Sequence, residues 1–141
     1  MSVVGIIGAG PYGLSLAAHL AGRDVEHRVF GRPMQFWSRI AKAGGERYLK
    51  SFCFGTNIST PRPGSSFADY NQPRGLEAFE PCSIANFAEY GQWFQQRNVH
   101  WAEPVEAMRV ERQGRGFVVT LADGERFMAD RVVIATGLAG F

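Results

Sequence analysis

The fold is set by a glycine-rich turn close to the N-terminus, Gly8-Ala9-Gly10-Pro11-Tyr12-Gly13. An apolar, β-branched run at residues 3–7 precedes it and shows no polar alternation, which is typical of a strand buried on both faces of a parallel sheet. Apolar residues then recur at helical spacing as far as Gly22, and residues 26–30 are expected to form a second strand. Because the strand, the helix and the second strand fit into about thirty residues, the sequence predicts a β-α-β unit.

The glycines of this turn have the spacing G-x-G-x-x-G, which after a strand and before a helix indicates a dinucleotide-binding fingerprint. In that fingerprint Gly8 makes the tight turn, Gly10 lets the backbone approach a pyrophosphate, and Gly13 lets the helix pack closely on the strand. Pro11 suits the first helical turn. The helix N-terminus offers N–H groups and a partial positive charge to phosphates, so the sequence predicts a nucleotide site here.

The end of the second predicted strand departs from this fingerprint. A carboxylate is expected about twenty residues after the glycines, where it holds the ribose hydroxyls. The chain has Gly31 there, followed by Arg32. Arg32 suits a 2′-phosphate and hence NADP, or both residues contact ribose and phosphates through backbone and guanidinium. The choice between FAD and NADP stays open at this position.

Several further elements are expected along the chain. A short helix is predicted around residues 34–42, and a longer one begins after Ser83 as its N-cap. Residues 51–82 are rich in turn formers and are predicted to be one long loop. A short strand is expected at residues 99–101, and residues 104–130 predict three antiparallel strands.

The last predicted strand, residues 131–135, is apolar and ends in Ala135-Thr136-Gly137. We expect it to be buried in the parallel sheet. In open α/β sheets ligands bind at the carboxyl ends of the strands, so this turn is expected beside the nucleotide.

Composition limits the kind of protein. The 141 residues are 45% hydrophobic and 20% charged, which fits one globular domain, and the formal net charge of +2 favours neither a nucleic-acid nor a membrane partner. Cys53 and Cys82 are not a C-x-x-C pair and are typical of reduced thiols in a cytoplasmic protein. No metal-ligand spacing and no Ser-His-Asp order is visible in the sequence, so we predict no metal site and assign no catalytic residue.

The β-α-β opening, the helix, the antiparallel meander and the closing Ala-Thr-Gly strand together resemble the FAD-binding domain of flavoproteins that bind two dinucleotides. The likeness covers the whole chain. A narrower likeness to flavin-containing monooxygenases and lysine/ornithine N-hydroxylases rests on residues 30–37, 49–51 and 90–94 and on the final strand. The resemblance implies a single α/β, Rossmann-like FAD/NAD(P)-binding domain over residues 1–141, with a parallel sheet and a three-stranded meander.

The resemblance implies an FAD-dependent oxidoreductase, a monooxygenase in which NADPH reduces bound FAD and O₂ is used to oxygenate a small-molecule substrate. The family's second glycine fingerprint, which binds NADPH, is not found in this sequence. We therefore expect the chain to be an N-terminal portion that needs a C-terminal NADPH domain or a partner chain, and to be catalytically incomplete by itself.

The resemblance also implies which residues meet the cofactor. Trp37, and Lys50 with Ser51, correspond to segments along the flavin, and Val105 opens the strand that contributes backbone contacts to the adenine. The turn at residues 135–137 lies near the pyrophosphate. The expected cofactor-binding residues are Gly8, Ala9, Gly10, Pro11, Tyr12, Gly13, Gly31, Arg32, Trp37, Lys50, Ser51, Val105, Ala135, Thr136 and Gly137.

Three other interpretations stay open. A non-catalytic module that binds FAD or NADP is favoured by the missing second fingerprint. A fragment of an NADP-dependent dehydrogenase is favoured by Arg32 and disfavoured by the meander. A disulfide-reductase flavoprotein is disfavoured because the sequence has no C-x-x-C motif.

Overall fold

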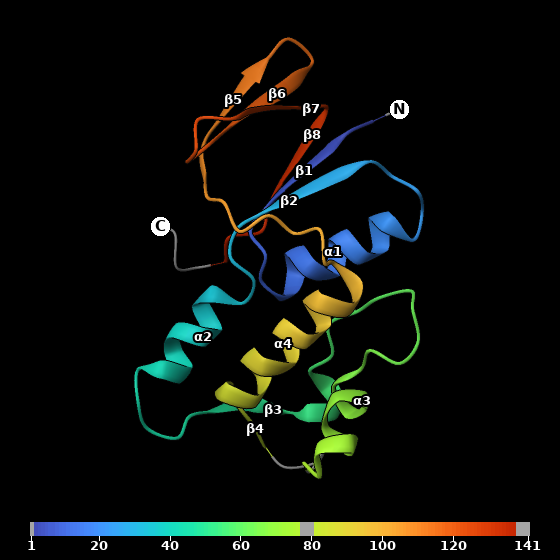
Figure 1. The fold of residues 1–141 in the computed structure, drawn as a ribbon, viewed down its shortest axis with the longest axis vertical. Helices are drawn as coiled ribbons and strands as arrows, with labels where there is room; N and C mark the ends of the chain where they lie inside the picture. The colour runs from blue at the N-terminus through green and yellow to red at the C-terminus, as the bar shows by residue number, and fades with distance from the viewer. Residues whose placement is uncertain (1, 77–80, 138–141) are drawn as a thin grey trace.

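The computed structural model describes residues 2–76 and 81–137, and Figure 1 labels its elements. A parallel sheet is formed by β2 (His27–Phe30), β1 (Val4–Ile7) and β8 (Arg131–Ile134), in that spatial order. Helix α1 (Pro11–Ala21) connects β1 to β2. The predicted β-α-β unit and the α/β, Rossmann-like fold class are confirmed.

The two faces of this sheet are covered by different elements. Successive residues of a strand point to opposite faces. Val4 and Ile6 of β1 belong to a large core cluster with Leu14 of α1, whereas Ile7 belongs to a smaller cluster with Leu121. Helix α1 therefore packs on one face, and the antiparallel sheet to which Leu121 belongs packs on the other.

Those antiparallel strands are β5 (Ala107–Gln113), β6 (Gly116–Leu121) and β7 (Arg126–Ala129). They form the meander at the top of Figure 1. Gly114 and Gly124 lie in its two turns with φ of +61° and +90°, a region that L side chains rarely adopt. The meander is confirmed, although its first strand begins at Ala107 and so leaves Val105 in the preceding segment.

The other end of the molecule is mainly helical. It contains α2 (Gln35–Lys42), α3 (Phe67–Asn71), α4 (Ile84–Asn98), the 3₁₀ turns η1 (Cys53–Gly55) and η2 (Gln72–Arg74), and the antiparallel pair β3 (Tyr48–Phe52) and β4 (Pro81–Ser83). Both predicted helices are confirmed. The Ser83 hydroxyl caps α4 by accepting a hydrogen bond of 3.0 Å from the Asn86 N–H.

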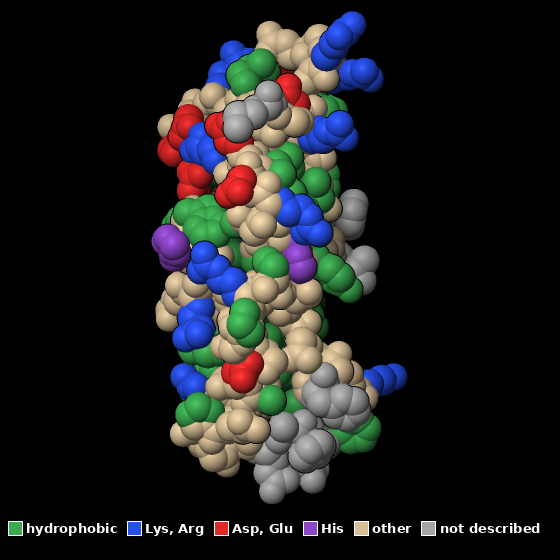
Figure 2. Space-filling view, turned by 90° about the vertical axis from the view of Figure 1, so that its right-hand side faces the viewer, with side chains coloured by type: hydrophobic (Ala, Val, Ile, Leu, Met, Phe, Trp, Pro, Cys, Tyr) green, Lys and Arg blue, Asp and Glu red, His purple; other side chains and the backbone are tan. Residues whose placement is uncertain are grey.

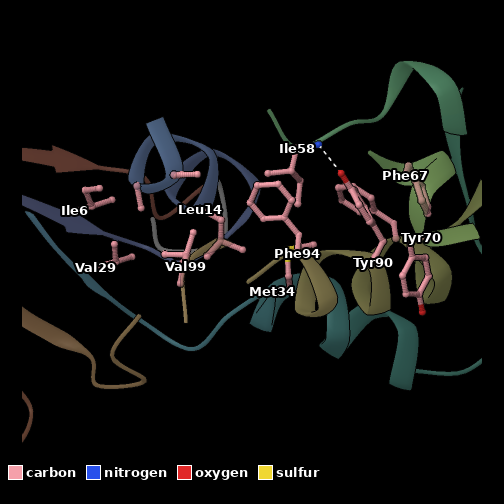
Figure 3. Packing of buried hydrophobic residues seen from close by; sticks show 14 of the residues in the cluster. Ile6, Leu14, Val29, Met34, Ile58, Phe67, Tyr70, Tyr90, Phe94 and Val99 are labelled. Atoms are coloured by element: carbon pink, nitrogen blue, oxygen red, sulfur yellow. Dashed lines mark hydrogen bonds between the residues drawn. The ribbon is translucent and has the colours of Figure 1, made fainter. Parts of the chain in front are cut away.

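A continuous apolar core joins the two ends, as Figure 3 shows. Met34 and Phe94 are fully buried in it and lie between the sheet residues and a group of aromatic side chains. This aromatic cluster consists of Tyr90 and the rings around it, Phe67 and Tyr70 among them. Gly91 of α4 makes room for Met34, because a Cβ at residue 91 would lie 2.4 Å from the Met34 Cε. Close packing of this kind fixes α2 against α4.

Tyr90 is the centre of the aromatic cluster and is fully buried. Its ring stacks on Phe67, with 4.4 Å between ring centroids. Its hydroxyl accepts a hydrogen bond of 3.0 Å from the Ile58 N–H (Figure 3). The same hydroxyl donates one of 3.0 Å to the Ser65 carbonyl. A tyrosine is needed here because the hydroxyl satisfies two backbone groups that no strand or helix satisfies.

The prediction of a single long loop over residues 51–82 is wrong. The segment contains α3 and two 3₁₀ turns, and β3 and β4 reach into its two ends. Helix α3 starts with a capping box in which Ser66 and Asp69 satisfy each other's backbone N–H groups. Tertiary burial of the aromatic residues outweighs the turn-forming composition.

Two strand predictions also need correction. Residues 99–101 form no strand: Val99 is the C-cap of α4, and its N–H donates to the Gln95 carbonyl at 2.8 Å. Strand β8 exists as predicted but is not buried, because it is the edge strand of the described sheet and Ile134 is 59% exposed.

The molecular surface carries no single basic face in the view of Figure 2. Lysine and arginine side chains are spread along the length of the molecule there and alternate with acidic and apolar ones. Within residues 2–76 and 81–137, no helix combines the length and apolar character needed to cross a bilayer.

Candidate dinucleotide site

Gly8 is required by the fold itself. Its φ is +113°, and a Cβ there would lie 2.3 Å from the Ala135 carbonyl oxygen. Its N–H donates to the Phe30 carbonyl at 2.8 Å. The turn after β1 is thereby locked between the ends of β2 and β8, with no space for a side chain.

Gly13 is also required by the fold. A Cβ at residue 13 would lie 1.9 Å from the Gly8 carbonyl oxygen, so any side chain would force α1 away from the turn. The predicted role of this glycine, close packing of the helix, agrees with this contact.

Gly10 differs from both of these glycines. It is the N-cap of α1 with φ of −80°, a conformation open to every residue, and a Cβ there would meet no atom of the described residues within 4 Å. Neither backbone strain nor packing among residues 2–76 and 81–137 explains a glycine at this position. The open space in front of Gly10 lies at a helix N-terminus that no described side chain caps and whose first turn has no acidic residue. Such an N-terminus attracts an anion.

The backbone conformation at residue 31 explains why a glycine, and not the expected carboxylate, stands at the end of β2. Its φ is +128°, and a Cβ there would lie 3.3 Å from the Ala9 nitrogen. A side chain at residue 31 would be strained and would crowd the glycine turn. Arg32, the next residue, is exposed, and no ion pair is formed by it among the described residues.

The end of β8 forms another wall of the same region. The Ala135 N–H donates to the Ile7 carbonyl at 2.7 Å, and Gly137 has φ of +73°. An open, mainly apolar hollow of about 440 Å³ lies between this segment and α1, lined by Tyr12, Leu16, Val133, Ile134, Ala135, Thr136 and Gly137. The hollow lies at the carboxyl end of β8, which is where open α/β sheets bind ligands.

Two contacts that the sequence did not predict complete the region. The Gly31 N–H donates to the Glu103 carbonyl at 2.9 Å, and the Met34 N–H donates to the Ala9 carbonyl at 3.0 Å. Glu103 thereby brings the segment before the meander, including the half-buried Val105, to the end of β2. No local sequence signal announces either contact, because both join residues distant along the chain.

The structure thus gathers most of the expected cofactor-binding residues around one turn. They are Gly8 to Gly13, Gly31 and Arg32, Val105, and Ala135 to Gly137. Their contact with a cofactor stays a prediction.

The group of residues around the glycine turn does not include Trp37, Lys50 or Ser51. Trp37 is half-buried in the core, where its ring meets Phe87 edge-on with 5.0 Å between centroids. Lys50 and Ser51 lie on β3, at the end of α4 remote from the glycine turn (Figure 1). A ligand that touched both groups would have to extend along the length of α2 and α4.

The two cysteines lie together in the core, away from the glycine turn. Both are buried thiols, and burial is the main cause that raises the pKa of Cys82, with a further contribution from Cys53 beside it. A raised pKa keeps Cys82 in its protonated thiol form, which is unreactive because the thiolate is the nucleophile. Within the part of the chain that the structure describes, no group of three potential ligands could hold a metal ion.

These features define a dinucleotide-binding protein of the Rossmann type. A family model described as FAD-NAD(P)-binding matches residues 66–139, just over half of the 141 residues. The chain therefore belongs to the FAD-NAD(P)-binding family. No curated protein sequence matches it.

Three solved structures illustrate which proteins share this fold. A flavin-containing monooxygenase from Stenotrophomonas maltophilia aligns with a TM-score of 0.75 and 22% identity, over 96% of this chain and 39% of that one. The bacillithiol disulfide reductase of Staphylococcus aureus gives 0.72 and 17%, over 97% and 39%. The lysine monooxygenase NbtG of Nocardia farcinica gives 0.72 and 17%, over 97% and 54%.

At these identities the likeness establishes the fold. The chain spans only about two fifths to one half of the length of these three proteins.

Proposed function

We propose that this chain is the FAD-binding portion of a flavin-dependent, NAD(P)H-using oxidoreductase, with monooxygenation of a small molecule as its reaction. The family assignment and the fold support a dinucleotide as ligand. The flavin monooxygenases with this fold support FAD, and support NADPH as the reductant. The remainder of the activity would come from a C-terminal NADPH domain or a partner chain.

Gly10 is the observation that carries this proposal. The fold demands glycine at residues 8 and 13, but at residue 10 the missing side chain leaves open space at the N-terminus of α1. Backbone N–H groups and a helix dipole that face open space fit a pyrophosphate. A dinucleotide is the ligand class that uses such a cradle beside the end of β2.

Each part of the region has a role in this proposal. The first turn of α1 would bind the pyrophosphate, Gly31 and the segment with Val105 would hold the adenosine half, and residues 135–137 would lie against the pyrophosphate. Trp37, Lys50 and Ser51 would line the flavin half if the cofactor extends along α2. FAD supplies hydride and electron transfer when it is bound. The described residues provide binding and orientation, and we assign none of them to proton transfer.

A site for NADP is the second candidate, and Arg32 favours it. A guanidinium beside the end of β2, with no carboxylate at residue 31, suits a 2′-phosphate. Arg32→Gln separates the two cases. If FAD is the ligand, its Kd should change by less than about threefold, because an exposed side chain contributes little. If NADP is the ligand, its Kd should rise at least about tenfold, because a charge-assisted contact is lost.

Thiol chemistry within this chain is less well supported. A disulfide reductase needs a reactive thiolate, and burial raises the pKa of the Cys82 thiol.

We propose a cytoplasmic location, because two reduced thiols in contact are typical of a reducing compartment.

The visible absorption spectrum of the purified chain tests the proposal, followed by titration with FAD, FMN and NADPH. We expect flavin bands, or quenching of FAD fluorescence on addition, with FAD bound more tightly than FMN because the adenosine half is held. The chain alone should not oxygenate substrates with NADPH. A colourless protein that NADP stabilises and FAD does not would contradict the proposal.

A further inference from the structure

Arg28 joins three parts of the molecule next to the proposed nucleotide site. It lies on β2, three residues before Gly31. Its Nε donates to Glu103 Oε1 at 2.7 Å and its Nη2 donates to Glu103 Oε2 at 2.6 Å, which makes a two-pronged ion pair. Its Nη1 also donates to Glu125 Oε1, in the turn before β7, at 2.5 Å. One guanidinium therefore ties β2 to the segment at Glu103 and to the meander.

The surroundings of Arg28 hold it in one orientation. The guanidinium lies 5.0 Å from the ring centroid of Phe30 and 4.9 Å from that of Phe127. These two rings meet edge-on, with centroids 5.4 Å apart. The side chains of Arg28 and Glu103 are only 30% and 33% exposed, so the pair is better shielded from water than an ordinary surface ion pair.

Glu103 is where this ion pair meets the proposed site. Its N–H donates to the Val29 carbonyl and its carbonyl accepts from the Gly31 N–H, both at 2.9 Å. The Glu103 backbone thus runs beside the end of β2, and its carboxylate is fully engaged by Arg28. Because Gly31 has no side chain, the backbones of these two segments are what the structure offers to an adenosine there.

We propose that Arg28 is a positioning residue for nucleotide binding: by gripping Glu103 it fixes the segment from Glu103 to Val105 beside Gly31 and so sets the affinity for the adenosine half of the ligand. The inference rests on the proposed function, because it needs a dinucleotide in this site. Arg28 itself contacts protein side chains, and its effect passes through Glu103.

The test compares two variants that each neutralise one carboxylate. Glu103→Gln keeps the shape of the side chain and removes its charge from the Arg28 pair. Glu111→Gln removes the same charge from the ion pair with Arg109, 3.0 Å long and on the meander, where it does not touch the segment. Kd values for ADP and FAD are measured by calorimetry for the wild type and both variants, with melting temperatures alongside.

We expect Glu103→Gln to raise the Kd of ADP and of FAD by about the same factor, roughly tenfold, because the loss concerns the shared adenosine half. The difference in Kd between Glu103→Gln and the wild type should become smaller at about 1 M NaCl, because salt screens a partly exposed ion pair. Glu111→Gln should leave both Kd values within about twofold. A purely structural role would lower the melting temperature and leave the Kd values of the folded protein unchanged.

The outcomes separate the inference from the proposed function. If the wild type binds neither FAD nor ADP, the proposed function is wrong and the inference falls with it. If the wild type binds both and Glu103→Gln binds them equally well, or loses no more than Glu111→Gln, the inference alone is overturned. Should Glu103→Gln fail to fold, Arg28→Lys provides the same comparison, because it keeps the charge and loses the two-pronged geometry.

Discussion

The glycine turn and the aromatic cluster around Tyr90 are built in opposite ways. At the turn, Gly8 and Gly13 sit so close to carbonyl oxygens that any added atom would collide. In the cluster, buried rings stack on one another and a hydroxyl satisfies two backbone groups. The turn is therefore sensitive to atoms gained and the cluster to atoms lost. A site made of backbone leaves its surface free for a ligand, whereas a site made of packed side chains does not.

The largest effect is expected from adding one methyl group at the turn. Gly13→Ala would place its Cβ 1.9 Å from the Gly8 carbonyl oxygen, and neither backbone can yield without moving α1. We expect a loss of more than about 3 kcal/mol in the free energy of unfolding, measured in urea. Gly55→Ala is the control, because a Cβ there meets no atom of the described part of the chain within 4 Å. Equal unfolding midpoints for Gly13→Ala and the control would show that the turn is not locked.

A smaller effect is expected from removing one oxygen atom in the cluster. Tyr90→Phe leaves the Ile58 N–H and the Ser65 carbonyl without their hydrogen bonds. Two unsatisfied backbone groups should lower the free energy of unfolding by about 1–3 kcal/mol at pH 7.

The same hydroxyl gives the cluster a pH dependence. Burial raises the pKa of Tyr90 to about 12, so the folded protein holds the phenol proton more tightly than the unfolded chain does. Below a pH of about 10 the proton is present in both states, and between about 10 and 12 the wild type should lose up to about 2 kcal/mol as the pH rises. Tyr90→Phe should lack this part of the decline. Urea unfolding of both proteins at each pH measures this decline in the free energy of unfolding. If the decline is identical in both, the pH dependence does not come from the Tyr90 hydroxyl.

These two regions also differ in how far the sequence predicts them. The roles of Gly8 and Gly13 follow from the motif, because a tight turn and a close helix leave few residue types possible. In the cluster, the prolines and glycines of residues 51–82 favoured a loop, whereas the structure has a helix that begins with a capping box of Ser66 and Asp69. Burial of Phe67 and Tyr70 decides the structure there, and burial depends on partners distant in the chain.

Within the candidate site the same limit applies. The missing carboxylate at Gly31 was visible in the sequence, but its cause was not: the positive φ and the nearby Ala9 nitrogen emerge only in three dimensions. The contact of Glu103 with Gly31 spans 72 positions and has no local signal. Val99 was predicted to be a strand residue, and β-branched and aromatic residues such as Val99 and Trp101 are typical of strands, whereas in the structure Val99 is the C-cap of α4.

We propose that Gly10 is a glycine for the sake of the ligand and not of the fold, and titration of Gly10→Ala with FAD is the sharpest test of that role. Both Gly10→Ala and the control Gly55→Ala should unfold within about 1 kcal/mol of the wild type, since a Cβ at either residue meets none of the described residues within 4 Å. The Kd of FAD should rise at least about tenfold for Gly10→Ala, because the methyl group occupies the approach of the pyrophosphate, and should stay unchanged for Gly55→Ala. A folded Gly10→Ala protein that binds FAD as tightly as the wild type would show that Gly10 does not make room for a pyrophosphate.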